Sequence, residues 1–128
     1  RCVKASVTNF PRIMNRLQGF GEDKQGFLDK LNRYDCLVID DLGVERDTSY
    51  SVEQIYNVVD ARSRSGKPLI VTTNLSLDDL RNPSSMGYAR IYDRVLEMCP
   101  IKLKLAGDSR RTVNAAARRD RAKEILGM

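Results

Sequence analysis

The fold of this chain is decided by the stretch Leu37-Val38-Ile39-Asp40-Asp41-Leu42-Gly43, in which an apolar run ends in two adjacent acids. The run begins near Tyr34, and a short run that is apolar on both faces is typical of a buried strand in a parallel sheet. Open α/β sheets place their ligand crevice at the carboxyl ends of the strands, where Asp40 and Asp41 stand. Because successive strand residues point to opposite faces, one acid can hold Mg²⁺ while the other orients an attacking water. The alternative is an acidic turn that caps the next element.

A second buried strand is predicted at Leu69–Thr73, and it also ends in a polar residue, Asn74. The carboxyl ends of parallel strands lie at the same edge of a sheet, so we expect Asn74 to share the crevice with Asp40 and Asp41. An asparagine amide can donate to a phosphate oxygen and accept from a water molecule. The alternative role for Asn74 is a helix cap or an Asx-turn that leads into Ser76.

Strands and helices alternate along the whole chain. Besides the two buried strands, the sequence predicts strands at 2–8 and 101–105 and helices at 9–17, 22–32, 51–66, 76–80, 86–98 and 113–126. Asn9 is expected to cap the first helix, and Ser51 with Gln54 forms a capping-box pattern at the third. This alternation predicts an α/β fold with a largely parallel sheet, and 128 residues are enough for one domain.

The composition excludes several kinds of site. The chain has no histidine, which removes the commonest general base and the commonest zinc ligand. Its three cysteines, Cys2, Cys36 and Cys99, are far apart and suggest neither a disulfide framework nor a metal clip. No apolar run approaches the roughly 18 residues of a membrane helix. We therefore expect a cytoplasmic protein whose chemistry uses carboxylates, hydroxyls, amides and cations.

Two pairs of arginines complete the candidate site residues. Arg90 and Arg94 lie four residues apart and share one face of a predicted helix. Such a face can act as an arginine finger that reaches a phosphate on a neighbouring subunit, or it can be a salt-bridged solvent face. A turn at 107–109 precedes Arg110 and Arg111, which can clamp a phosphate bidentately or form an ordinary basic loop.

The order of these features resembles the AAA+ helicase loaders of the DnaC type and the related IstB-type transposition helpers. The features are the strand with two acids, Val-Thr-Thr-Asn at 71–74, Arg-Ile-Tyr-Asp-Arg at 90–94 and Gly-x-Ser-x-Arg at 107–111. The resemblance covers roughly residues 3–113. It implies a P-loop NTPase (AAA+) fold, a three-layer α/β/α arrangement with a mainly parallel sheet that is incomplete at its N-terminus. Residues 1–128 would then be a partial ATPase domain that runs from Walker B to sensor 2.

The resemblance also implies a role for each matching residue at the strand ends. Asp40 matches the Walker B aspartate that binds the metal. Asp41 takes the place of the residue that activates water, where many relatives have glutamate. Asn74 matches sensor 1.

The arginines match the family less uniformly. Arg94 matches the arginine finger, with Arg90 as the other choice. Arg111 matches the sensor 2 arginine, but Arg110 stands where the family usually has an aromatic residue. This departure leaves open which of Arg110 and Arg111 would contact the nucleotide.

One family motif, G-x-x-x-x-G-K-[ST], does not occur in the sequence. This P-loop cradles the β- and γ-phosphates, and the early glycines at 19, 21 and 26 do not reproduce its spacing. We therefore expect this chain alone to bind nucleotide weakly or not at all, whereas a parent protein would bind and hydrolyse ATP with Mg²⁺. The absent strand would lie between 69–73 and 101–105. Without it, the last strand would move over, chains would pair with each other, or the gap would stay open.

The resemblance implies three partners: a replicative DNA helicase, single-stranded DNA, and further copies of the parent in an AAA+ oligomer. A transposition helper is the rival within the same family. A phosphoacceptor receiver domain also has paired acids after a strand, but Lys67 precedes its strand here rather than following it. A non-catalytic DNA-binding module is the third hypothesis, because six basic and two acidic residues lie from position 110 onward.

Overall fold

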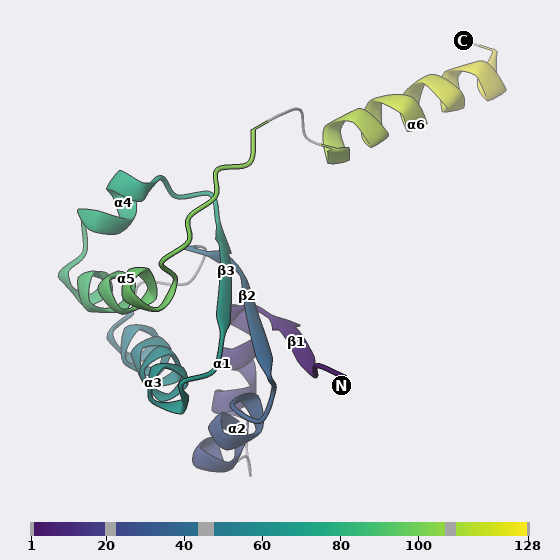
Figure 1. Ribbon diagram of the computed structural model, residues 1–128. Helices are drawn as coiled ribbons and strands as arrows, with labels where there is room; N and C mark the ends of the chain where they lie inside the picture. The colour runs from purple at the N-terminus through teal and green to yellow at the C-terminus, as the bar shows by residue number, and fades with distance from the viewer. Residues whose placement is uncertain (1, 20–22, 44–47, 107–109, 128) are drawn as a thin grey trace.

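The computed structural model describes residues 2–19, 23–43, 48–106 and 110–127, with the side chains of 110–113 outside the description. The elements are β1 (Ala5–Thr8), α1 (Phe10–Gln18), α2 (Lys24–Leu31), β2 (Cys36–Leu42), α3 (Ser49–Ser65), β3 (Leu69–Thr73), α4 (Leu77–Arg81), α5 (Met86–Met98) and α6 (Arg110–Leu126). Figure 1 shows their arrangement. No described helix is both long and apolar enough to cross a membrane.

The described strands form one parallel sheet in the order β1-β2-β3. Thr8 pairs with Ile39, and Ile39 pairs with Val71, so the carboxyl ends of all three strands lie at the same edge. The predicted α/β class with a parallel sheet is confirmed. A three-stranded parallel sheet flanked by helices is compatible with an incomplete P-loop-type fold.

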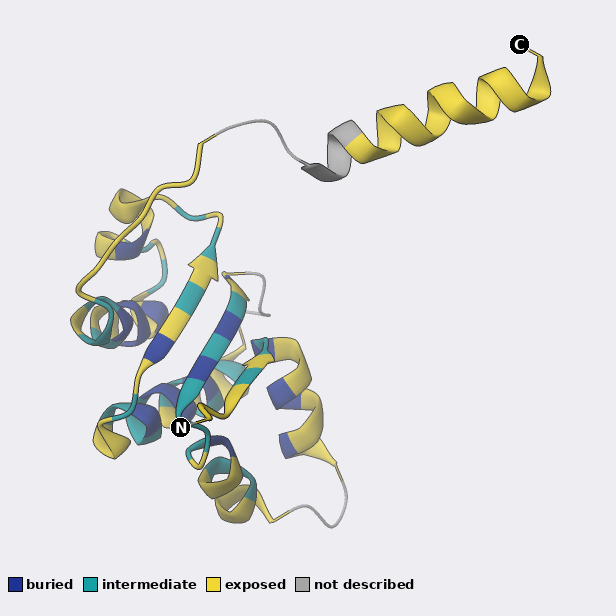
Figure 2. Cartoon of the chain, turned by 45° about the vertical axis from the view of Figure 1, so that its right-hand side comes forward, coloured by how far each residue is buried: buried dark blue, intermediate teal, exposed yellow. Residues whose placement is uncertain are grey.

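The hydrophobic core lies on one face of this sheet. Leu37 and Ile39 point into it and are almost completely buried, as are Ile55 on α3 and Ile91 on α5. On the opposite face, Val7 and Ile70 are 65% and 51% exposed. The predicted burial of Leu69–Thr73 on both faces is therefore wrong, because no described helix covers this face of the sheet. Figure 2 shows this contrast along the strands, and it shows α6 standing apart from the sheet with its described side chains exposed.

One of the two predicted helix caps is confirmed, and the start of α4 agrees with the helix predicted from residue 76. The Asn9 side chain accepts from the Arg12 N–H at 2.9 Å, as predicted for the start of α1. Ser76 opens α4 with a capping box. The predicted capping box at Ser51 is wrong, because the Thr48 hydroxyl accepts from the Ser51 N–H and α3 begins earlier. Both residues carry a capping hydroxyl, so the local pattern alone does not choose between them.

The predicted strand at 101–105 is not formed. Ile101, Leu103 and Leu105 are 80%, 83% and 94% exposed, and the segment is neither helix nor strand. Its apolar alternation can be buried only against a partner strand, and no described strand lies beyond β3. Of the three outcomes expected beside the absent strand, movement of the last strand to pair with β3 is not seen in the described residues.

Arg62 on α3 is the one fully buried charged side chain among the described residues. Its Nε and Nη2 donate to the Pro68 carbonyl at 3.2 and 2.6 Å, and its Nη1 donates to the Tyr34 carbonyl at 3.0 Å. Burial lowers the pKa of this guanidinium. Arg62 therefore ties the end of α3 to the segments that lead into β2 and β3.

The turn after β2 requires glycine. Gly43 has φ +106°, and a Cβ atom there would lie 2.8 Å from Leu75 Cδ1, whereas Gly66 after α3 has φ +68° and open space around it. We expect Gly43→Ala to lower the free energy of unfolding by about 2–3 kcal/mol and Gly66→Ala by about 1 kcal/mol. Urea unfolding followed by circular dichroism measures both, and equal losses would show that the contact with Leu75 is relieved without cost.

Candidate functional site

The paired acids lie on a bulge at the carboxyl end of β2. Ile39 pairs with Val71 and Leu42 with Thr73, so Asp40 and Asp41 together stand opposite the single residue Thr72. Asp41 has φ +56°, in the left-handed region that short acidic side chains tolerate. The bulge places Asp40 half-buried and Asp41 exposed, so the two carboxylates have different surroundings.

The Thr72 hydroxyl holds this bulge in place. It accepts from the Asp41 N–H at 3.0 Å and donates to Asp40 Oδ1. A carboxylate fixed by a neighbouring strand has less freedom than one on a free turn. This role of Thr72 was not predicted from the sequence, although a hydroxyl at the end of an apolar strand is a recognisable feature.

Asn74 lies just past the end of β3, at the same edge of the sheet. Thr73 fixes the preceding backbone, because its hydroxyl donates to the Leu42 carbonyl at 2.6 Å and accepts from the Leu75 N–H at 3.1 Å. Ser76, and not Asn74, caps α4. Asn74 is exposed, and its amide has no hydrogen-bond partner in the described part of the chain. Asn74 and the two acids therefore follow neighbouring strands at the same edge of the sheet, and a shared role for them stays a prediction.

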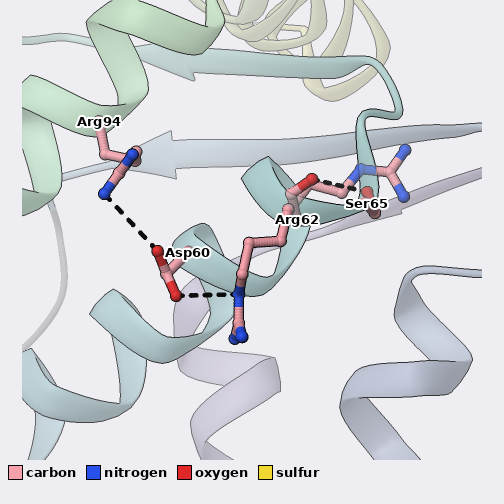
Figure 3. Close-up of polar contacts among 5 residues, drawn as sticks. Asp60, Arg62, Ser65 and Arg94 are labelled. Atoms are coloured by element: carbon pink, nitrogen blue, oxygen red, sulfur yellow. Dashed lines mark hydrogen bonds and ion pairs between the residues drawn. The ribbon is translucent and has the colours of Figure 1, made fainter.

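The two arginines of α5 contact α3 of their own chain. Arg94, 35% exposed, lies 3.7 Å from Asp60 and 3.8 Å from Glu97, and Figure 3 shows Asp60 facing it from the neighbouring helix. A hydrogen bond with Tyr56 raises the pKa of Arg94, and Glu97 and Asp60 act in the same direction. The Arg90 guanidinium lies 4.5 Å from the centroid of the Tyr56 ring. In this single chain Arg94 is thus part of an ion-paired surface.

The remaining predicted site residues follow residue 106, where the description of side chains ends until residue 114. The turn at 107–109 lies outside the described residues, and so do the side chains of Arg110 and Arg111. Their assignment to a phosphate stays a prediction.

The donor set at the strand ends fits a hard cation better than a soft one. Asp40, Asp41 and Thr72 offer only oxygen atoms, which suit Mg²⁺ when water completes its coordination. The described residues contain no group of three or more acidic, cysteine or histidine side chains that could enclose a metal. Pockets of about 460 and 320 Å³ lie against α2 and are lined by other residues. Neither of these two pockets includes Asp40, Asp41 or Asn74.

Replacing Thr72 by valine removes the hydroxyl group and so measures how much that group contributes to stability. Valine is a better strand former, so Thr72→Val would stabilise the chain if the hydroxyl did nothing. We expect instead a loss of about 1 kcal/mol in the free energy of unfolding, because the Asp41 N–H and the Asp40 carboxylate each lose a partner. Thr72→Ser keeps the hydroxyl and serves as the control. A valine variant more stable than the serine variant would contradict the anchoring role.

Comparison with known proteins finds distant relatives of part of the chain. The sequence matches none of the protein-family profiles with which it was compared. It is 33% identical over 75 residues to the replicative helicase loader DnaC of Escherichia coli strain K12, covering 59% of this chain and 29% of that protein. It is 31% identical over 110 residues to the phage-like element PBSX protein XkdC of Bacillus subtilis strain 168, covering 77% and 38%.

A third relative, the uncharacterized protein YqaM of Bacillus subtilis strain 168, is 31% identical over 94 residues, covering 65% of this chain and 29% of that protein. The chain thus spans 29–38% of the length of these curated relatives. The similarity to a helicase loader is distant and partial, and it agrees with the resemblance that the motifs indicated.

Proposed function

We propose that this chain is part of an ATP-binding and ATP-hydrolysing protein that loads a replicative DNA helicase. The observation that carries the proposal is the Asp40 carboxylate, held by Thr72 at the carboxyl edge of a parallel sheet, the edge at which β3 leads into Asn74. The partial identity to the loader DnaC supports the same family. A transposition helper of the IstB type is the rival function, and interaction with a hexameric helicase separates the two.

Each residue at the sheet edge has a proposed role. Asp40 holds Mg²⁺, with Thr72 keeping the carboxylate in one position. The metal, when bound together with ATP, neutralises the charge that develops on the phosphates. Asp41, exposed on the bulge, orients the attacking water. Asn74 contacts the terminal phosphate and the same water through its amide.

The arginines would act between subunits and around the nucleotide. Arg94, or Arg90 in its place, reaches a phosphate on a neighbouring subunit of an AAA+ oligomer. To reach that phosphate, Arg94 must break its ion pair with Asp60, so it exchanges one anionic partner for another. Arg111 or Arg110 clamps the phosphates from the same chain. Single-stranded DNA and the helicase are the proposed partners of the assembled protein.

We further propose that residues 1–128 form a partial ATPase domain, completed by a phosphate-binding loop from a preceding segment of a longer protein. Two observations support this: β3 is an edge strand of the described sheet, and the side chains of Val7 and Ile70 are exposed on the sheet face opposite the core. A strand inserted beside β3 would also give the segment at 101–105 a partner.

The test is a titration of a fluorescent ATP analogue with Mg²⁺. It compares the 128-residue chain with a longer version that includes the expected phosphate-binding loop. We expect the longer version to bind with a dissociation constant in the micromolar range, and the 128-residue chain to show no saturation up to about 1 mM. A longer version without its loop lysine is the control. Failure of every version to bind would overturn the ATPase proposal.

A non-catalytic DNA-binding module is the second candidate, because α6 is exposed along its described length and carries Arg118, Arg119 and Arg121. Contact with phosphates would weaken steeply as salt concentration rises. The absence of aromatic residues from α6 disfavours base stacking there.

A further inference from the structure

A second candidate site lies at the sheet edge formed by β1, opposite to the edge formed by β3. A pocket of about 460 Å³ opens there between β1, α1 and α2. None of the residues assigned to nucleotide chemistry lines it, so it is independent of the proposed function.

Three cations surround this pocket. Arg12 and Arg16 come from one face of α1, and Lys30 comes from α2. No aspartate or glutamate is among the described residues that line it. The Arg16 guanidinium lies 5.2 Å from the centroid of the Phe27 ring, which orients that side chain. Arg12 and Lys30 form no ion pair within the described part of the chain. The pocket therefore favours an anionic ligand.

The third wall of the pocket is the outer edge of β1. The Lys4 carbonyl accepts from Cys36 on the β2 side, and backbone groups alternate along a strand, so the N–H and C=O groups of Val7 point away from β2. Val7 lines the pocket, and β1 has no strand on its outer side in the described part of the chain. A strand edge of this kind can pair with an incoming extended chain.

We propose that this pocket binds an extended acidic peptide segment of another protein, which adds as a strand beside β1 while its carboxylates contact Arg12, Arg16 and Lys30. The spacing of the cations suits such a ligand. Arg12 and Arg16 lie about 6 Å apart along a helix axis, and alternate residues of a strand lie about 6.6 Å apart. Glutamates or aspartates at every second position would therefore meet successive arginines.

A single strand of nucleic acid is the other polyanion that the cations could attract. It fits less well because it has no main-chain amide to pair with the backbone of Val7. Base stacking also needs an open aromatic face, and one face of the Phe27 ring is covered by Arg16. The peptide uses both the charges and the strand edge.

The first experiment measures binding to the 128-residue chain by fluorescence anisotropy. The probe is a fluorescein-labelled peptide of about ten alternating threonine and glutamate residues. We expect saturable binding that is weakened at least about tenfold in the triple variant Arg12→Gln, Arg16→Gln, Lys30→Gln. The matched control, Arg118→Gln, Arg119→Gln, Arg121→Gln, removes the same number of charges from α6 and should change binding less than about twofold. Circular dichroism checks that all variants fold.

The second experiment separates strand addition from simple charge attraction. Two further probes carry N-methyl groups, one on every threonine and one on every glutamate, so each blocks the hydrogen bonds of one edge of the peptide. We expect one probe to lose binding and the other to keep it. Equal binding of both would overturn the proposal, as would loss of binding only in the α6 variant or no binding of the parent peptide. An oligothymidylate that binds more tightly and depends on the same three cations would assign the pocket to nucleic acid instead.

Discussion

Replacement of Arg62 by alanine is expected to lower the free energy of unfolding by roughly 3–5 kcal/mol. The side chain is fully buried and donates three hydrogen bonds to two main-chain carbonyls, those of Tyr34 and Pro68. Alanine would leave both carbonyls without these donors, and it would open a cavity at the end of α3. A loss of this size is a large part of the stability of a chain of this length.

The neighbouring arginine on the same helix is the matched control. Arg64 is 75% exposed and pairs only with Asp60 at 3.2 Å among the described residues, so Arg64→Ala should cost about 0.5 kcal/mol. Arg62→Lys keeps the positive charge, but lysine cannot donate to both carbonyls as the planar guanidinium does. Its loss of unfolding free energy should therefore lie between those of the two alanine variants. Urea unfolding measures all three. Similar losses for Arg62→Ala and Arg64→Ala would show that water replaces the buried contacts.

Local sequence patterns correctly predicted the helices and strands that depend mainly on residues within the element itself. The apolar runs that became β2 and β3 have strand-forming residues at consecutive positions, so a continuous run was enough to identify them as strands. The run did not show that only one face of each strand would be covered, because that depends on which helices pack against the sheet. Asn9 marked the start of α1 because its side chain acts on the backbone of its own helix turn.

Features that depend on distant partners were not predictable in this way. The segment at 101–105 has the pattern of a strand, but a strand exists only with a partner, and the sequence does not contain the partner that the resemblance requires. Arg62 was missed because Arg62 and Arg64 look alike in the sequence, and only the fold decides which of them is buried.

For the candidate site, too, some features could be predicted from local patterns and others depended on contacts between distant segments. Asp40, Asp41 and Asn74 could be grouped from the sequence because parallel strands end at one edge. The bulge that places both acids opposite Thr72 depends on the register of two strands, which local patterns do not contain. The contacts of Arg94 with α3 likewise depend on how two helices pack.

Under the proposed ATPase function, replacement of Asp40 by asparagine is expected to reduce ATP hydrolysis by about 100-fold or more in the longer version of the protein. Asparagine has nearly the same shape, and its carbonyl oxygen can still accept from the Thr72 hydroxyl, so the bulge should persist. What is lost is the negative charge that would hold Mg²⁺. We expect the unfolding transition of the variant to change little while its turnover number falls.

The control is the same substitution near the other end of the strand. Asp35 precedes β2, and its Oδ2 accepts from the Lys4 N–H at 2.9 Å, a role that asparagine can also fill. Asp35→Asn should therefore change turnover by less than about twofold. Turnover is measured by phosphate release at saturating ATP. Equal losses of turnover in the two variants would show that both acids act by maintaining the structure of β2. A loss confined to Asp40→Asn with unchanged stability would require a role in the reaction, because the two substitutions remove the same charge from segments joined by one strand.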